Sequence, residues 1–95
     1  MRYRNIARVV AAAREQSGLS QAEICKELGW VSGQFMSNVE RGISSIPPEK
    51  FRTFAQLTGI SVLSLQEAHM ADIRHDIERR SRALIIRTKA RYGKV

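Results

Sequence analysis

The sequence predicts an all-α protein, a compact domain of five helices followed by a basic helical extension. Apolar residues recur at intervals of three and four along almost every stretch, and no stretch before the tail alternates apolar and polar residues as a strand would. Residues that start and stop helices separate these stretches. The 95 residues, 43% of them hydrophobic, suffice for one modest core. We expect the domain in residues 1–70 and the extension in residues 71–95.

The first predicted helix spans residues 3–16, and Gly18 ends it. Its buried stripe consists of Ile6, Val9, Val10 and Ala13. Ser20 caps the second helix, and Glu23 three residues later completes a capping box. The inner face of this second helix consists of Ile24, Cys25 and Leu28. Gly29 then forms the turn, with an expected positive φ.

Ser32 is the predicted cap of the third helix, which ends at Gly42 and turns Met36 and Val39 inward. Pro48 suits the first position of the fourth helix. The shared face of the fourth helix consists of Phe51, Phe54, Ala55 and Thr58. Gly59 stops the fourth helix. Ser61 caps the fifth helix, which carries Val62, Leu65, Ala68 and His69.

The tail leaves two conformations open. Ile73, Ile77 and Leu84 continue an apolar seam at spacings of four and seven, which favours one long helix to about Arg82. Residues 82–89 include two adjacent isoleucines, which also suit a short strand. A seam that extends beyond the globular body usually packs against a partner, so we expect a homodimer.

The net charge of +7 is concentrated at the end of the chain. Residues 1–73 carry a net charge of +1, whereas residues 74–95 carry +6. Such a tail is either a solvated end or a contact for a polyanion, which means DNA phosphate or an acidic protein partner.

Several classes of function find no support in the sequence. Cys25 is alone, and His69 and His75 do not share a helical face, so we expect no disulfide, metal or cofactor. No nucleophile–base set, carboxylate pair or phosphate-binding glycine loop points to an enzyme. No apolar run is long enough to cross a membrane, and the first helix does not read as a signal peptide, so we expect a cytoplasmic, nucleoid-associated protein.

Residues 18–42 carry the strongest functional signal. They read as a short helix, a turn and a second helix with small or amide-bearing outer residues. Gln34 and Asn38 lie one helical turn apart, and an amide side chain can pair bidentately with adenine in the major groove of DNA. In a basic chain this pattern favours sequence-specific binding of double-stranded DNA.

The same residues resemble the Cro/repressor-type helix-turn-helix family (lambda-repressor-like, XRE-type) of phage repressors and small bacterial regulators. The matching positions, within a resemblance that covers residues 4–68, are Leu19-Ser20-Gln21, Ile24-Cys25, Gly29 and Glu40-Arg41-Gly42. The resemblance implies a five-helix bundle that binds a palindromic operator as a dimer, with the third helix in the major groove.

The resemblance also implies roles for individual residues. Base contacts would come from Ser32, Gly33, Gln34, Ser37 and Asn38. Contacts to the DNA backbone would come from Ser20, Gln21, Arg41, Ser44 and Ser45. Arg14 and Glu40 match an ion pair that ties the first helix to the end of the third.

Two features depart from the family pattern. Trp30 adds a residue after the turn glycine and is expected to pack, while the role of Phe35 stays open. Gly33 sits where many relatives carry a long side chain, so either one base contact is lost or the backbone approaches DNA closely.

The predicted function is a dimeric transcriptional regulator, most simply a repressor. The alternative is an antitoxin-like protein that binds DNA with its body and a protein partner with its tail.

Overall fold

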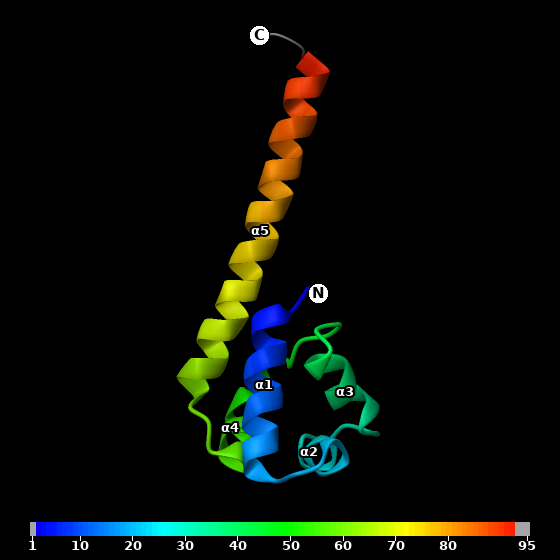
Figure 1. Ribbon diagram of the computed structural model, residues 1–95, viewed down its shortest axis with the longest axis vertical. Coiled ribbons are helices and arrows are strands. Elements are labelled where there is room, and N and C mark those ends of the chain that lie inside the picture. The colour runs from blue at the N-terminus through cyan, green and yellow to red at the C-terminus, as the bar shows by residue number, and fades with distance from the viewer. Residues whose placement is uncertain (1, 93–95) are drawn as a thin grey trace.

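Five α-helices and one short 3-10 turn make up the protein, seen in a computed structural model that describes the backbone of residues 2–92 and the side chains of residues 2–83 (Figure 1). The elements are α1 (Arg4–Ser17), α2 (Gln21–Glu27), α3 (Gln34–Glu40), η1 (Pro48–Lys50), α4 (Phe51–Thr58) and α5 (Val62–Tyr92). The described backbone contains no strand, and the prediction of an all-α fold is confirmed. Helix α5 packs beside α1 and then projects beyond the body formed by α1–α4 (Figure 1).

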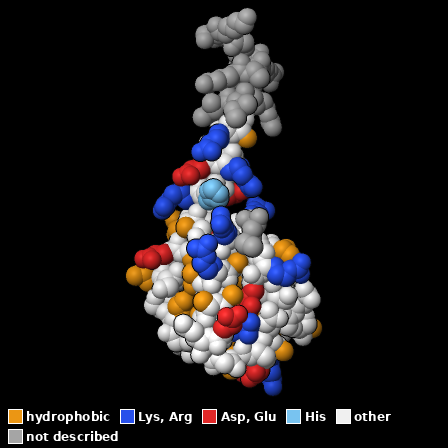
Figure 2. All heavy atoms as spheres, in the orientation of Figure 1, with side chains coloured by type: hydrophobic (Ala, Val, Ile, Leu, Met, Phe, Trp, Pro, Cys, Tyr) orange, Lys and Arg blue, Asp and Glu red, His pale blue; other side chains and the backbone are white. Residues whose placement is uncertain are grey.

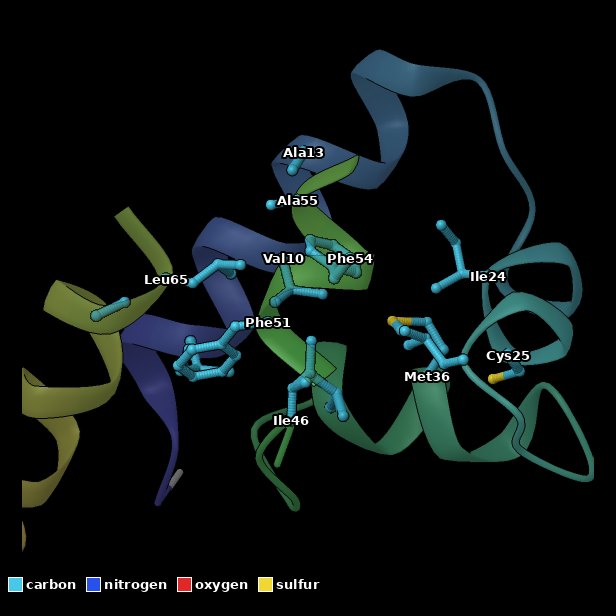
Figure 3. Close-up of a cluster of buried hydrophobic side chains, with 14 residues drawn as sticks. Val10, Ala13, Ile24, Cys25, Met36, Ile46, Phe51, Phe54, Ala55 and Leu65 are labelled. Atoms are coloured by element: carbon cyan, nitrogen blue, oxygen red, sulfur yellow. The ribbon is translucent and has the colours of Figure 1, made fainter. Parts of the chain in front are cut away.

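The core lies where all five helices meet (Figure 3). Phe54 of α4 is fully buried, as are the predicted inward residues Met36 and Val39 of α3. The other fully buried apolar side chains come from α1, α2 and the residue after it, α5 and the loop before η1; they are Ile6, Val10, Ile24, Cys25, Leu28, Ile46 and Leu65. Because α3 contributes its inner residues to this core, its opposite face is left on the surface.

Two predicted helix starts are wrong. Helix α3 begins at Gln34, and Ser32 does not cap it; its hydroxyl only accepts the N–H of Gln34 at 3.4 Å. The residue before the helix is Gly33, whose φ of −66° and ψ of −10° are helical, whereas a side-chain cap needs an extended residue there. Pro48 begins η1 instead of α4, because the N–H of Lys50 bonds back to Pro47 in a tighter turn.

The start of α5 follows the prediction. The Ser61 hydroxyl accepts the N–H of Ser64 at 3.1 Å, as expected of an N-cap. The backbone stays helical to Tyr92, so the strand alternative for residues 82–89 is wrong. Adding a residue to an existing helix costs less free energy than nucleating a new element, so the helix continues past the two isoleucines. Leu84 of the predicted seam lies outside the described side chains.

Helix α5 also passes the expected domain boundary at residue 70 without a break. No helix in the described part of the chain is long and apolar enough to cross a bilayer.

A carboxylate from α5 caps the N-terminus of α1. Tyr3, the residue before α1, offers no side-chain cap. Instead, the buried carboxylate of Asp72 accepts the N–H groups of Asn5 (2.9 Å) and Ile6 (3.0 Å) and the Nδ2 amide of Asn5 (2.9 Å). These bonds satisfy donors that a helix start leaves free, and they fix α5 against α1.

Replacing Asp72 with alanine is expected to lower the free energy of unfolding by about 1–2 kcal/mol, because the first turn of α1 loses its cap. Urea unfolding followed by circular dichroism measures this change. The matched control is Asp76→Ala, one turn along α5. That carboxylate makes surface ion pairs with Arg79 and Arg80, so its loss should cost less than about 1 kcal/mol. Equal losses in the two variants would contradict the capping role.

Candidate nucleic-acid interface

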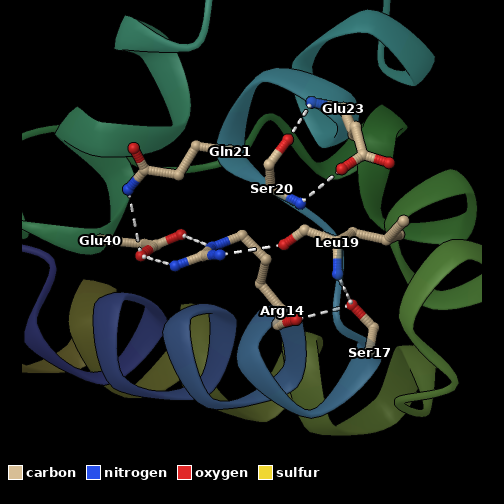
Figure 4. Close-up of polar contacts among 7 residues, drawn as sticks. All are labelled: Arg14, Ser17, Leu19, Ser20, Gln21, Glu23 and Glu40. Atoms are coloured by element: carbon tan, nitrogen blue, oxygen red, sulfur yellow. Dashed lines mark hydrogen bonds and ion pairs between the residues drawn. The ribbon is translucent and has the colours of Figure 1, made fainter.

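Helix α2 starts with the predicted capping box (Figure 4). The Ser20 hydroxyl accepts the N–H of Glu23 at 3.0 Å, and the Glu23 carboxylate accepts the N–H of Ser20 at 3.1 Å. The pKa of Glu23 lies below its ordinary value. The main cause is the hydrogen bond from the Ser20 backbone, and the hydrogen bond with the Ser20 side chain is the second cause. These bonds define where α2 begins, and therefore where Gln21 stands.

The turn between α2 and α3 is closed by backbone hydrogen bonds around Gly29. Its φ of +80° confirms the predicted left-handed conformation, which a side chain would disfavour. The N–H of Gly29 donates to the Lys26 carbonyl at 3.2 Å, and the N–H of Trp30 donates to the Cys25 carbonyl at 2.8 Å. This pair of bonds is a Schellman motif, and it sets the direction in which the chain leaves α2.

Gly33 allows α3 to approach α2 closely. A Cβ atom at this position would lie 3.3 Å from the backbone nitrogen and 3.4 Å from the Cα of Ala22. A side chain at residue 33 would therefore point at α2. The glycine permits a close approach between α2 and the start of α3, the two helices of the motif.

The outer face of α3 carries a linked pair of amides. Gln34 is exposed and Asn38 is half-buried, and the Nε2 of Gln34 donates to the Oδ1 of Asn38 at 3.0 Å. That bond uses one of the two N–H groups of the Gln34 amide and one of the two lone pairs of the Asn38 oxygen. Each amide can therefore still offer both a donor and an acceptor to an external ligand. Ser37 is half-buried and Ser32 is exposed near the start of the helix.

A polar network holds α1, α2 and α3 together behind this face (Figure 4). The Arg14 guanidinium binds both carboxylate oxygens of Glu40, the longer bond being 3.1 Å, and donates to the Leu19 carbonyl at 3.0 Å. The side chains of Arg14 and Glu40 are only 17% and 11% exposed. The hydrogen bond to Glu40 is the main cause that raises the pKa of Arg14. The two residues matched to an ion pair by resemblance do form one.

Gln21 joins the same network. Its Nε2 donates to the Oε1 of Glu40 at 3.3 Å, which links the first residue of α2 to the last residue of α3. Ser20 and Arg41 are exposed beside these two ends, and Ser44 and Ser45 are half-buried in the loop after α3. The Ser44 N–H donates to the Asn38 carbonyl at 3.3 Å, so this loop stays against α3. The five residues expected to contact the DNA backbone therefore flank α3.

An aromatic stack lies at the start of α3. Trp30 packs against the core, as predicted, and its ring stacks on that of Phe35 with centroids 4.5 Å apart and an interplanar angle of 29°. Phe35 remains 45% exposed, and Val31 between them is fully exposed. Val31 carries no signal in the sequence, because a single valine in a turn belongs to no motif.

The other titratable groups singled out earlier do not belong to the outer face of α3. Cys25 is buried, and burial raises the pKa of its thiol. The ring of His69 lies edge-on to Phe51, with centroids 5.6 Å apart. Among residues whose side chains are described, no three His, Cys, Asp or Glu residues gather as a metal site would require.

Basic side chains gather where α1 meets α5. Figure 2 shows Lys and Arg side chains around a histidine near the base of the projecting helix. One groove between the two helices is lined by Arg2, Arg4, Arg8, Arg74 and His75, with Asp72 and Glu78 as its acids. Since the Asp72 carboxylate is occupied by the start of α1, the positive charges outnumber the available acids.

This arrangement of two short helices, closed by a Schellman turn and braced by a third helix, is that of a helix-turn-helix protein. A family model described as a helix-turn-helix domain matches residues 5–68, and the chain belongs to this family. Helix-turn-helix domains bind DNA, and the match agrees with the resemblance over residues 4–68. No curated protein and no solved structure matches the chain.

Proposed function

We propose that this protein is a sequence-specific transcriptional regulator, a dimeric repressor that reads a palindromic operator with α3 in the major groove. The observation that carries the proposal is the amide pair on the outer face of α3. That face belongs to a helix whose position is fixed from behind by the ion-pair network. A rigid helix with free amide groups suits base recognition, because little conformational entropy is lost on binding.

Gln34 and Asn38 are the proposed adenine readers, through bonds to N6 and N7. Ser32 and Ser37 have short side chains, which let the helix enter the groove and bond to phosphates or bases. Gly33, proposed as a base contact by resemblance, is better explained by its approach to Ala22.

Phosphate contacts are proposed for the residues that flank α3. Ser20 and Gln21 stand at the start of α2, where backbone N–H groups favour an anion. Arg41, Ser44 and Ser45 follow the end of α3. Such contacts position the protein on the duplex without carrying sequence information.

Dimerisation is proposed to use the exposed apolar face of α5. Leu63, Met70 and Ile77 are spaced by seven residues, and Ile73 lies beside them. These side chains are between 39% and 60% exposed, which is unusual for four large apolar residues on one helix. Spacing of seven is that of a coiled-coil seam, and a second copy of α5 would cover it. In a two-fold dimer the two α3 helices would meet half-sites about 34–36 Å apart.

The double variant Met70→Lys/Ile77→Lys is expected to sediment as a monomer, because charges in a seam oppose its burial. His75→Lys is the matched control, since residue 75 is exposed on α5 but lies on the opposite face from Ile77. The control should sediment as a dimer. A native protein that sediments as a monomer while it occupies both half-sites would contradict the α5 interface.

The basic surface supports a further contact to phosphate or to an acidic protein. The groove between α1 and α5 and the net charge of +6 in residues 74–95 both attract polyanions. Co-purification of a stoichiometric acidic partner would favour the antitoxin-like alternative. A protein with this function would work at the nucleoid.

Selection from random duplex DNA by the purified protein tests the proposal. The expected result is an inverted repeat, bound with an affinity that falls as salt rises, by a slope of about 0.9 per phosphate contact. A scrambled duplex of equal length is the control. Recovery of no preferred sequence would contradict the proposed function.

A further inference from the structure

Two large apolar side chains are exposed in the turn before α3 and in its first turn. Val31 is fully exposed in the turn before α3, and Phe35 is 45% exposed in its first turn. Single exposed apolar residues are common on protein surfaces. These two differ because they lie in the helix-turn-helix motif itself, the segment that carries the groups proposed to read bases.

The ring of Phe35 is held in one position by a stacking contact. Its ring stacks on Trp30, with centroids 4.5 Å apart. Trp30 is itself fixed in position. Its side chain packs against the core, and its backbone N–H donates to the Cys25 carbonyl at 2.8 Å. The exposed part of the Phe35 ring is therefore a preformed apolar surface.

This surface is continuous with the amide pair. Phe35 follows Gln34 directly and precedes Asn38 by three residues, and residues three apart are neighbours on a helix surface. The bond between Gln34 and Asn38 fixes the polar part. A ligand that meets α3 from outside would find donor and acceptor groups beside an apolar ring, and Val31 is exposed in the turn that leads into the helix.

The major groove offers one apolar group, the C5-methyl of thymine. We infer that Val31 and Phe35 are specificity-determining residues that contact thymine methyl groups at base pairs next to those read by Gln34 and Asn38. The inference rests on the proposed function, since it needs α3 to lie in the major groove. It predicts an operator half-site in which thymines adjoin the adenines contacted by the amides.

The test replaces thymines of the selected half-site by uracil, one at a time. Uracil lacks only the C5-methyl group and pairs normally. The native protein is expected to lose about fourfold in affinity at one or two positions, the loss that matches burial of one methyl group. Val31→Ala and Phe35→Ala should each abolish the loss at one position, although both still prefer the selected duplex to a scrambled one.

Ile43→Ala is the matched control, because Ile43 is also exposed (54%) but lies beyond the end of α3. This variant should keep the full sensitivity to uracil. Val31→Ala changes a fully exposed residue and is expected to fold normally; thermal melting checks this for Phe35→Ala, which loses the stack on Trp30.

Two results would overturn the inference while leaving the proposed function intact. One is native protein that binds uracil-substituted and thymine-containing duplexes equally at every position yet still rejects scrambled DNA. The other is a selected half-site without thymine. Failure to select any sequence would instead contradict the proposed function, and the inference that rests on it would fail as well.

Discussion

Glu40→Ala is expected to lower the free energy of unfolding by about 3 kcal/mol, the largest effect predicted for a single residue. The substitution leaves the guanidinium of Arg14 without its carboxylate, although 83% of that side chain is buried. Breaking a buried ion pair from one side costs about 3–5 kcal/mol, and the lower end applies because Arg14 keeps some contact with water. The Arg14 bond to the Leu19 carbonyl also remains. Urea unfolding measures the change.

The double variant Arg14→Met/Glu40→Met separates the cost of a stranded charge from the value of the pair. Because it strands no charge, it should recover much of the stability lost in Glu40→Ala. Glu27→Ala, an exposed glutamate at the end of α2, is the surface control and should change stability by less than about 0.5 kcal/mol. A double variant no more stable than Glu40→Ala would show that the network acts through geometry and not through charge.

Gln34→Ala is expected to reduce discrimination at one adenine of the operator by a factor of about 5 to 150. The physical reason is the loss of a bidentate amide–adenine contact, worth about 1–3 kcal/mol against the wrong base. Affinity for scrambled DNA should stay the same, since phosphate contacts do not depend on this side chain. Competition binding against duplexes that carry each base in turn measures the effect.

Gln56→Ala is the control, because Gln56 is also an exposed glutamine but lies on α4. It should leave both specificity and affinity unchanged. If Gln34→Ala weakened binding to all duplexes equally, the Gln34 side chain would contact the DNA backbone. The face that reads bases would then lie elsewhere on α3.

The sequence determined the elements because their signals are local. Helical spacing, the Ser20 and Glu23 capping box and the turn at Gly29 each act within one or two turns, and all are found as predicted. The Ser32 cap failed because it depended on the conformation of Gly33, which packing against α2 sets.

Only the tertiary structure decided how these elements meet. Asp72 caps α1 from 66 residues away, and the absence of a capping residue at Tyr3 was the only signal in the sequence that a remote cap was needed. The Trp30–Phe35 stack and the approach of Gly33 to Ala22 depend on the angle between α2 and α3. Periodicity and caps specify where a helix lies along the chain, but contacts between helices depend on packing, which no short stretch of sequence encodes.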